Sequence, residues 1–335
     1  MKIVFFETEP WEKKYLGERI IGHETEFYEE SINHVESKTM YDADIIGIFI
    51  SSHVTKDVLD KFPNLKLVAS MSTGYDHIDI EECNKRGIVV CNVPAYGDNT
   101  VAEHAFGLIL NLARNIHKAY MRATHEEFSY KGLMGIDLQG KTLGVLGTGR
   151  IGQNVIRIAK GFGMNVIAFD AYQKQGLEEE LGFRYASFNE LLSSSDIISI
   201  HIPLTKDTFH MIDGEAINKM KDGVILINTA RGAIIDTEAL VDGLENGKIG
   251  SAGLDVLEGE LLIKDERELV HEVSSLPRAQ LELLLQDHKL MKMPNVVVTP
   301  HIGFYTKEAL QRILNTTLKN VFDLIEKRGF ENKVS

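Results

Sequence analysis

The sequence is poor in cysteine: its 335 residues include only two, Cys83 and Cys91. Two cysteines cannot form a disulfide framework, and these two lie outside the paired spacings that are typical of metal ligands. We therefore expect two buried thiols in a protein of the reducing cytoplasm, with no metal site.

A surplus of positive charge is also missing. The formal net charge is -13, and no run of Lys or Arg offsets it locally. Nucleic acids and anionic membrane surfaces are bound by clustered cations, so neither is expected as a partner.

Long apolar runs are absent as well. The longest apolar stretch, Val101–Ala113, is interrupted by Glu103, His104 and Asn111 and is shorter than the ~20 residues that a membrane span needs. We interpret it as a buried helix. The N-terminal MKIVFFETEP becomes acidic at once, which indicates a first strand rather than a secretory signal.

Short runs rich in Val, Ile and Leu alternate with segments of helical period, which is typical of strands buried on both faces of a parallel sheet. The pattern occurs twice. The first half offers the strands KIVFFE, ADIIGIFIS, LKLVASM and GIVVCNVP, and the second offers KTLGVLG, MNVIAF, DIISIHIP, GVILINTA, SAGLDV and NVVVT. Six strands suit the two mononucleotide-binding halves of a Rossmann domain. The fold class is therefore α/β, with two doubly wound parallel-sheet lobes.

Two long helices are expected outside these strands. One begins near Asp98 or Asn99, either of which can cap it, and runs to about Ala123; the other is the amphipathic segment from Lys307 to Lys327. The stretch from Glu258 to Pro294 is long for a connection, and QLELLLQ within it is helical. It is either an active-site cover, an interface piece or a solvated excursion.

A glycine-rich turn, GTGRIG, lies between a predicted strand and a predicted helix. Gly147 permits the tight turn, Gly149 lets the backbone approach a pyrophosphate, and Gly152 allows close helix packing. Asp170 ends the next strand, where a carboxylate can accept hydrogen bonds from the adenosine ribose and repel a 2′-phosphate. NAD is therefore favoured over NADP, and Lys174 is interpreted as a solvated charge.

Three chemically suitable side chains follow predicted strands of the second lobe. Arg231 can pair with a substrate carboxylate or carbonyl, His301 can act as acid and base, and Glu260 can favour the protonated imidazole. Asp255, which ends another strand, would lie closer to the nicotinamide. The structural alternatives are an Arg231–Asp255 salt bridge and a His301 at the surface.

The motifs GTGRIG, INTARG, GLDVLEGE and TPHIGFYT stand in an order that resembles the D-isomer-specific 2-hydroxyacid dehydrogenases, over nearly the whole chain. The resemblance implies catalytic roles for Arg231, Glu260 and His301. It implies a flavodoxin-like substrate domain of residues 1–98 plus 302–335 and an NAD-binding domain of residues 99–301. It also implies NAD contacts by the glycine turn and by Arg150, Ile151, Asp170, Ile202, Pro203, Thr208, Thr229, Ala230, Arg231 and Asp255.

The substrate residues are likewise implied by resemblance. STGYDHID is similar to the family loop whose backbone N–H groups hold the substrate carboxylate, which matches Thr73 and Gly74. NVPAY, VAEH, HIGFYT and the long insert resemble the D-lactate dehydrogenase branch. Tyr96 and Tyr305 carry that similarity and could line a pocket for a methyl group.

Other functions stay open at this point. D-Glycerate or phosphoglycerate dehydrogenase is the alternative within the family, although no extra basic residues can be placed for a phosphate. Glu260 stands where formate dehydrogenases carry glutamine. Relatives that act as NAD-sensing corepressors can keep the same catalytic residues, so a binding protein is the alternative from another class. The family commonly forms homodimers, which we also expect here.

Overall fold

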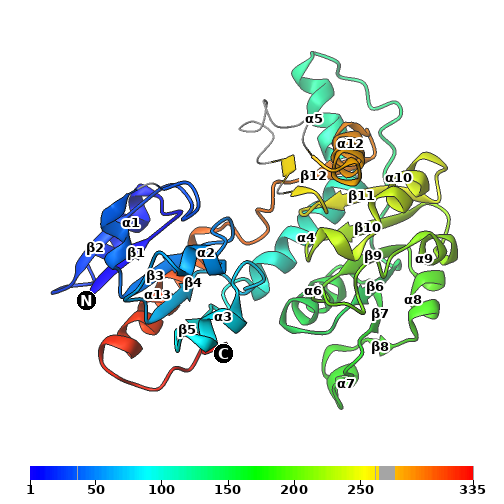
Figure 1. The fold of residues 1–335 in the computed structure, drawn as a ribbon. Coiled ribbons are helices and arrows are strands. Elements are labelled where there is room, and N and C mark those ends of the chain that lie inside the picture. The colour runs from blue at the N-terminus through cyan, green and yellow to red at the C-terminus, as the bar shows by residue number, and fades with distance from the viewer. Residues whose placement is uncertain (36, 261, 264–275, 335) are drawn as a thin grey trace. The chain divides into compact units, whose positions relative to one another are not determined.

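The computed structural model describes residues 1–35, 37–260, 262–263 and 276–334. The chain divides into two compact units, Met1–Tyr96 with Tyr305–Ser335 (unit 1) and Gly97–Phe304 (unit 2). Each unit contains one parallel sheet, of five strands in unit 1 and of seven in unit 2 (Figure 1). The predicted α/β class with two parallel-sheet lobes is confirmed.

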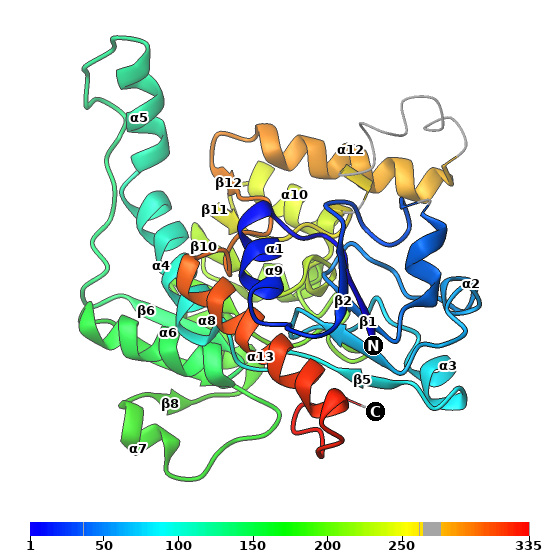
Figure 2. The same ribbon diagram turned by 90° about the vertical axis from the view of Figure 1, so that its left-hand side faces the viewer.

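Unit 1 has the strand order β2-β1-β3-β4-β5, which is the order of flavodoxin-like folds. Helices α1 and α13 contact each other, and α13 contacts β4 (Figures 1 and 2). The elements of unit 1 are β1 (Lys2–Phe5), α1 (Pro10–Gly17), β2 (Glu24–Phe27), η1 (Lys38–Asp42), β3 (Ile45–Ile48), α2 (Lys56–Leu59), β4 (Leu67–Ser70), α3 (Ile80–Lys85), β5 (Val89–Cys91) and α13 (Lys307–Ile325).

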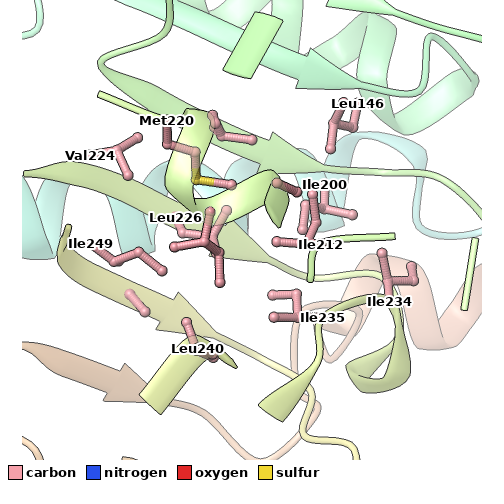
Figure 3. Packing of buried hydrophobic residues seen from close by; sticks show 14 of the residues in the cluster. Leu146, Ile200, Ile212, Met220, Val224, Leu226, Ile234, Ile235, Leu240 and Ile249 are labelled. Atoms are coloured by element: carbon pink, nitrogen blue, oxygen red, sulfur yellow. The ribbon is translucent and has the colours of Figure 1, made fainter. Parts of the chain in front are cut away.

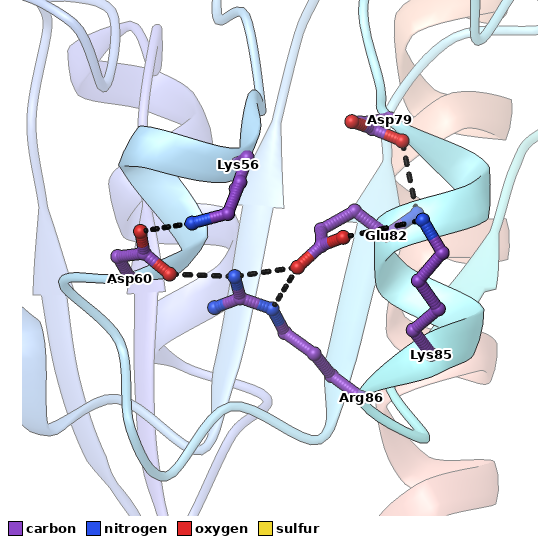
Figure 4. A network of polar contacts seen from close by, with 6 residues as sticks. All are labelled: Lys56, Asp60, Asp79, Glu82, Lys85 and Arg86. Atoms are coloured by element: carbon purple, nitrogen blue, oxygen red, sulfur yellow. Dashed lines mark hydrogen bonds and ion pairs between the residues drawn. The ribbon is translucent and has the colours of Figure 1, made fainter.

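An ion-pair network joins α2 to α3 on the surface of unit 1 (Figure 4). The guanidinium of Arg86 contacts Asp60 at 2.6 Å and Glu82 at 2.7 Å, and Lys56 contacts Asp60 at 2.8 Å. The pairs hold the pKa values of both carboxyls below the usual range. Because pairs near the surface stabilise a fold little, this network adds at most a small contribution to holding the two short helices together.

Unit 2 has the order β12-β11-β10-β9-β6-β7-β8, so the direction of chain progression reverses between β6 and β9. This is the Rossmann arrangement with one added strand. Its elements are α4 (Asp98–Ala113), α5 (Ile116–Thr124), β6 (Thr142–Leu146), α6 (Arg150–Gly161), β7 (Asn165–Phe169), α7 (Leu177–Leu181), β8 (Arg184–Tyr185), α8 (Phe188–Ser194), β9 (Ile197–Ile200), α9 (Gly214–Lys219), β10 (Val224–Asn228), η2 (Gly232–Ile234), α10 (Thr237–Glu245), β11 (Ile249–Leu254), α12 (Arg278–Lys292) and β12 (Val296–Val298).

Alternate residues of each central strand in unit 2 face opposite cores. Leu226 packs in one core with side chains of α8, α9, α10 and α12, whereas its neighbours Ile225 and Ile227 pack in the other with α4 and α6 (Figure 3). Both faces of the sheet are therefore buried, which explains why its strands have continuous apolar sequences. Each fully buried Leu or Ile contributes roughly 1.5–3 kcal/mol.

Every strand expected from an apolar run is present, but β2 and β8 were missed. Both are edge strands: β2 has the polar sequence ETEF, and β8 is only two residues long. An edge strand is held by hydrogen bonds on one side only and need not be apolar, so hydrophobic patterning cannot detect it.

The single helix expected from Asp98 to Ala123 is wrong in two respects. It is broken into α4 and α5 at Asn115, which adopts a left-handed conformation (φ 51°) that asparagine tolerates. Neither Asp98 nor Asn99 caps α4, because Gly97 occupies the N-cap and the amide of Asn99 donates to Glu103 instead. The buried helix expected at Val101–Ala113 is confirmed within α4, as is the tail helix as α13.

Cys83 and Cys91 are free and buried, as expected, and burial raises the pKa of the first thiol to about 11 and of the second to about 12. Across the described ranges, no helix combines the length and the apolar character that crossing a membrane requires. The residues the structure describes also contain no cluster of three His, Cys, Asp or Glu side chains suited to a metal ion.

Candidate active site

The parallel sheet of unit 2 places the carboxyl ends of its strands along one edge, where ligands bind in folds of this kind. The predicted site residues follow these strands in spatial order. Along the edge they are Asp170 after β7, Gly147 after β6, Ile202 after β9, Arg231 after β10, Asp255 after β11 and His301 close after β12.

The glycine turn has the geometry that its sequence predicts. Gly147 has a φ of 97°, and a Cβ there would lie 2.7 Å from the carbonyl oxygen of His201, at the end of β9. A Cβ on Gly152 would lie 1.9 Å from the carbonyl oxygen of Gly147, so α6 packs directly on the turn. A Cβ on Gly149 would meet no protein atom within 4 Å, which leaves that side of the turn accessible to a phosphate.

Asp170 is bound to this same turn. Its Oδ2 accepts hydrogen bonds from the backbone N–H and the hydroxyl of Thr148, at 2.6 and 2.8 Å. Its Oδ1 accepts the N–H of Tyr172 at 2.8 Å. The carboxylate is therefore held in one orientation beside the glycine turn, while Lys174 is exposed as expected.

These residues fit a dinucleotide. Helix α6 starts at the turn without a side-chain cap, so its first N–H groups are suited to a pyrophosphate. Further along the edge, the buried hydroxyl of Thr229 has no hydrogen-bond partner among the described residues, although its type normally has one. Thr208 fixes the loop after β9, because its hydroxyl donates to the carbonyl of Pro203 at 2.7 Å.

The remaining predicted NAD contacts lie on the same elements. Arg150 opens α6 and lies 3.6 Å from Asp98, from its Nε to the carboxylate. Ile151, Ile202 and Ala230 are half-buried beside the turn or at strand ends.

Arg231 lies in a tight turn after β10. The side-chain amide of Asn228 donates to the carbonyl of Arg231 and its oxygen accepts the N–H of Ala230, at 2.9 and 3.0 Å. The guanidinium of Arg231 donates to the carbonyl of Ala230 at 2.8 Å. A Cβ on the next residue, Gly232, would lie 2.1 Å from the carbonyl carbon of Leu257, so this turn packs against the chain that leads to Glu260.

His301 and Glu260 are brought together. Nδ1 of His301 lies 3.0 Å from Oε1 and 3.2 Å from Oε2 of Glu260, and the two side chains are 20% and 27% exposed. The alternative of a surface histidine is therefore wrong. The backbone of His301 is left-handed (φ 54°), and its N–H is held by the carbonyls of Asp255 and Thr299. A non-glycine residue in this conformation is strained by about 1–3 kcal/mol, so the surrounding contacts maintain it.

Asp255 is the main anchor of the His301 turn. Its carboxylate is 2% exposed and accepts hydrogen bonds from Thr299 (2.5 Å), the N–H of Ile302 (2.9 Å) and the N–H of Gly303 (2.7 Å). His104 of α4 lies 3.2 Å from it. Burial alone would raise the pKa of Asp255, but the hydrogen bonds from His104, Thr299 and Gly303 outweigh it and lower the pKa.

A cavity of about 380 Å³ borders the His301–Glu260 pair within unit 2. Most of its lining is apolar. It is lined by Asp255, Leu257, Glu260, Ile263, Met291, Val298, Thr299, Pro300 and His301.

The other predicted substrate residues belong to unit 1. The hydroxyl of Thr73 donates to the carbonyl of Val93, and that of Ser72 donates to the carbonyl of Gly74, so side chains fix this turn. Tyr305 donates its hydroxyl to Glu9, which raises the pKa of the phenol to about 12. The carbonyl of Tyr96 accepts a hydrogen bond from Arg312. Their substrate contacts stay predictions.

Sequence reasoning missed the residues that hold the site in place. His104 and Thr299 contact Asp255, and Asn228 shapes the Arg231 turn. Asn228 had a detectable signal, since it is a polar residue at the end of an apolar strand. His104 had none, because only the packing of α4 against β11 brings it to Asp255.

Comparison with known proteins identifies the family. Residues 106–303, more than half of the chain, match the family model of the D-isomer specific 2-hydroxyacid dehydrogenase NAD-binding domain. The chain belongs to this family. It is 38% identical to the D-lactate dehydrogenase of Escherichia coli (97% of each chain) and 39% identical to an aromatic 2-oxoacid reductase of Clostridium sporogenes (90% and 88%).

A solved structure agrees. The D-lactate dehydrogenase of Aquifex aeolicus, complexed with NAD and lactic acid, matches 99% of this chain and 98% of its own, with a TM-score of 0.87 and 36% identity. The chain is therefore an NAD-dependent dehydrogenase of this family, and residues 106–303, which lie in unit 2, match the family's NAD-binding domain.

Replacing Asp170 by alanine is expected to narrow the preference for NAD over NADP by about 10- to 100-fold, because the predicted contact with the adenosine ribose supplies charge-assisted hydrogen bonds and repels a 2′-phosphate. Steady-state kinetics with both cofactors measures the ratio. If the loss of the Thr148 contacts loosened the turn instead, the variant would bind both cofactors more weakly, by the same factor. Glu179→Ala, at an exposed position of α7, is the control; an unchanged ratio in Asp170→Ala shows that another residue contacts the ribose.

Proposed function

We propose that this dehydrogenase interconverts a small 2-oxo acid and its D-2-hydroxy acid, with pyruvate and D-lactate as the preferred pair. The proposal rests chiefly on the His301–Glu260 pair, which lies at the same sheet edge as the glycine turn. When bound, NADH supplies the hydride that reaches the carbonyl carbon.

The chain's own residues supply the proton and hold the substrate. Glu260 binds Nδ1 of His301, so Nε2 is the nitrogen that gives a proton to the carbonyl oxygen during reduction and takes it back during oxidation. Glu260 stabilises the imidazolium in the same way as the carboxylate partners of other catalytic histidines. Arg231 pairs with the substrate carboxylate or carbonyl through its planar guanidinium.

The choice of lactate is supported by the similarity to D-lactate dehydrogenases, whereas the similarity to an aromatic 2-oxoacid reductase is as close by identity. The decisive experiment is a panel of 2-oxo acids assayed by loss of NADH absorbance: glyoxylate, pyruvate, 2-oxobutyrate, phenylpyruvate and hydroxypyruvate. Pyruvate is expected to give the highest kcat/KM. A higher value for phenylpyruvate or hydroxypyruvate overturns the substrate choice, and no turnover of any acid overturns the enzymatic function in favour of an NAD-sensing binding protein.

We also propose that two copies pair through the arm formed by α5 and the following residues. Large apolar side chains of this arm are exposed, and a monomer seldom leaves such a patch in water. Their exposed fractions are 52% for Ile116, 66% for Tyr120, 53% for Met121, 96% for Phe128, 86% for Tyr130 and 92% for Met134. The arm is fixed to α4, because the N–H of Ile136 donates to the carbonyl of Ala113.

Light scattering is expected to give twice the chain mass of 37.6 kDa for the wild type. The double variant Phe128→Ser with Tyr130→Ser is expected to weaken association by at least tenfold, since it removes two large apolar contacts. Ile21→Ser, which changes an 81% exposed residue of unit 1, serves as the control. A dimer that persists unchanged in the double variant contradicts this interface.

We propose a cytoplasmic location for this protein, because its two cysteines are free and buried.

A further inference from the structure

The insert between Glu260 and His301 contains α12, and α12 carries a carboxyl group with no exposed surface, that of Asp287. Its Oδ2 accepts the backbone N–H of Gly259 at 2.9 Å. Gly259 directly precedes Glu260, the partner of His301. A side chain of the insert is therefore hydrogen-bonded to the turn that carries half of the acid–base pair.

The contact between α12 and this turn is close. A Cβ on Gly259 would lie 2.5 Å from Oδ2 of Asp287 and 3.3 Å from Cγ of Leu283, one helical turn earlier. Only a glycine lets the backbone come this near to the carboxylate. The position of residues 257–260 is thus set by α12 and not by the strand β11 alone.

The position of Asp287 is energetically unfavourable for a charged side chain. The pKa of Asp287 is raised to about 6, chiefly by burial and to a lesser extent by the charges of Glu258 and Glu260, while the Gly259 hydrogen bond and His288 only partly oppose the rise. Its second oxygen, Oδ1, has no hydrogen-bond partner among the residues that the structure describes. A neutral side chain of the same size would fill the space without a desolvation penalty, so packing does not explain a carboxylate here.

We propose that Asp287 is a positioning residue for the His301–Glu260 pair. By accepting the Gly259 N–H it fixes the turn 257–260, which holds Glu260 against Nδ1 of His301 and leaves Nε2 directed at the substrate. The insert then contributes to catalysis, since α12 fixes the position of the acid–base pair. This inference rests on the proposed roles of His301 and Glu260.

Two substitutions separate the hydrogen bond from the charge. Asp287→Leu removes the acceptor but keeps the number and branching of the heavy side-chain atoms, and Asp287→Asn keeps an acceptor oxygen but removes the charge. We expect Asp287→Leu to lower kcat about 10- to 100-fold with the KM for the 2-oxo acid and the Kd for NADH within about twofold, because misplacing a catalytic group by about 1 Å can cost about 100-fold in rate. Asp287→Asn should keep at least a third of the wild-type kcat at pH 7.5.

Leu284→Ala is the matched control on the same helix. Leu284 is buried (6% exposed), so its truncation loosens the packing of α12 without touching Gly259. Its kcat is expected to stay within threefold of the wild type. Equal losses in Leu284→Ala and Asp287→Leu, or an Asp287→Asn variant as slow as Asp287→Leu, overturn the proposal.

Amide hydrogen exchange tests the inference without any assay of activity. Exchange in the peptide containing residues 257–260 is expected to be at least tenfold faster in Asp287→Leu than in the wild type or in Leu284→Ala. A wild type that reduces no 2-oxo acid defeats the proposed function but leaves this test intact. An active wild type whose kcat and exchange do not change in Asp287→Leu defeats the inference alone.

The buried charge gives one more measurement. Among the residues that the structure describes, the charged groups near Asp287 are Glu258 and Glu260 on the turn and His288 on its own helix. The ion pair Glu245–Lys289 joins α10 to α12, and β12 is apolar. The pKa of Asp287 is higher in the fold than in the unfolded chain. Ionisation of this side chain therefore lowers the free energy of unfolding progressively as pH rises from 4 to 6, and the full loss is reached above pH 6. Asp287→Asn should therefore melt about 2–5 °C higher than the wild type at pH 8, with a smaller gap at pH 4.5. A lower melting temperature at pH 8 shows that the carboxylate stabilises the fold, and contradicts a positioning role kept at a cost.

Discussion

Replacing His301 by alanine is expected to lower kcat for 2-oxo acid reduction by about 10²- to 10⁴-fold, because the proton donor of the carbonyl oxygen is lost. The Kd for NADH should stay within about twofold, since the glycine turn and Asp170 lie on other strands of the sheet. The loss is expected in single-turnover measurements as well, which isolate the chemical step from product release.

His210→Ala is a matched control for this result. His210 also forms a pair with a glutamate of the same turn, 2.8 Å from its Nε2 to Glu258, and it also has a left-handed backbone (φ 49°). Its removal should leave kcat within a few-fold of the wild type. If His301→Ala loses NADH binding instead of turnover, the imidazole serves the cofactor and the acid–base role is misassigned.

Replacing Arg231 by lysine is expected to lower kcat/KM for the 2-oxo acid by about 10²- to 10⁴-fold even though the positive charge is retained. Two charge-assisted hydrogen bonds from one planar group cannot be reproduced by an ammonium, and each contributes roughly 1.5–3 kcal/mol. The turn should survive the change, because Asn228 and Gly232 fix its backbone independently of the guanidinium.

The measurement is kcat and KM for the preferred acid, together with the Kd for NADH. Arg157→Lys, at a position of α6 where the side chain is 48% exposed, is the control for changing an arginine elsewhere in unit 2. An Arg231→Lys variant within tenfold of the wild-type kcat/KM contradicts a paired contact with the substrate, and indicates that charge alone suffices.

Much of the fold is readable from hydrophobic patterning because the central strands are buried on both faces. Runs such as VILI at the start of β10 contain no polar residue, and the crossover helices between the strands impose parallel pairing. The errors fall where burial is incomplete. The sequence ETEF of β2 carries no apolar signal, and the break between α4 and α5 depends on Asn115 adopting a conformation that its neighbours permit.

The parts of the site that follow strands are readable for a related reason. Strand ends in a parallel sheet meet at one edge, so a residue that closely follows an apolar run can be placed in space without knowing the packing. Gly147, Asp170, Arg231 and His301 are all of this kind. The pairing of His301 with Glu260 was expected in the same way, and the distance of 3.0 Å agrees with it.

The sequence by itself therefore determined the two parallel-sheet lobes, the NAD turn and the family, because these depend on local pattern and on short motifs. Only the tertiary structure decided how the His301–Glu260 pair is held. His104 reaches Asp255 from α4, and Asp287 reaches Gly259 from α12, across separations of 151 and 28 residues along the chain. Contacts of this kind form when helices pack on a sheet. Neither the spacing nor the type of these residues in the sequence predicts which partner each will contact.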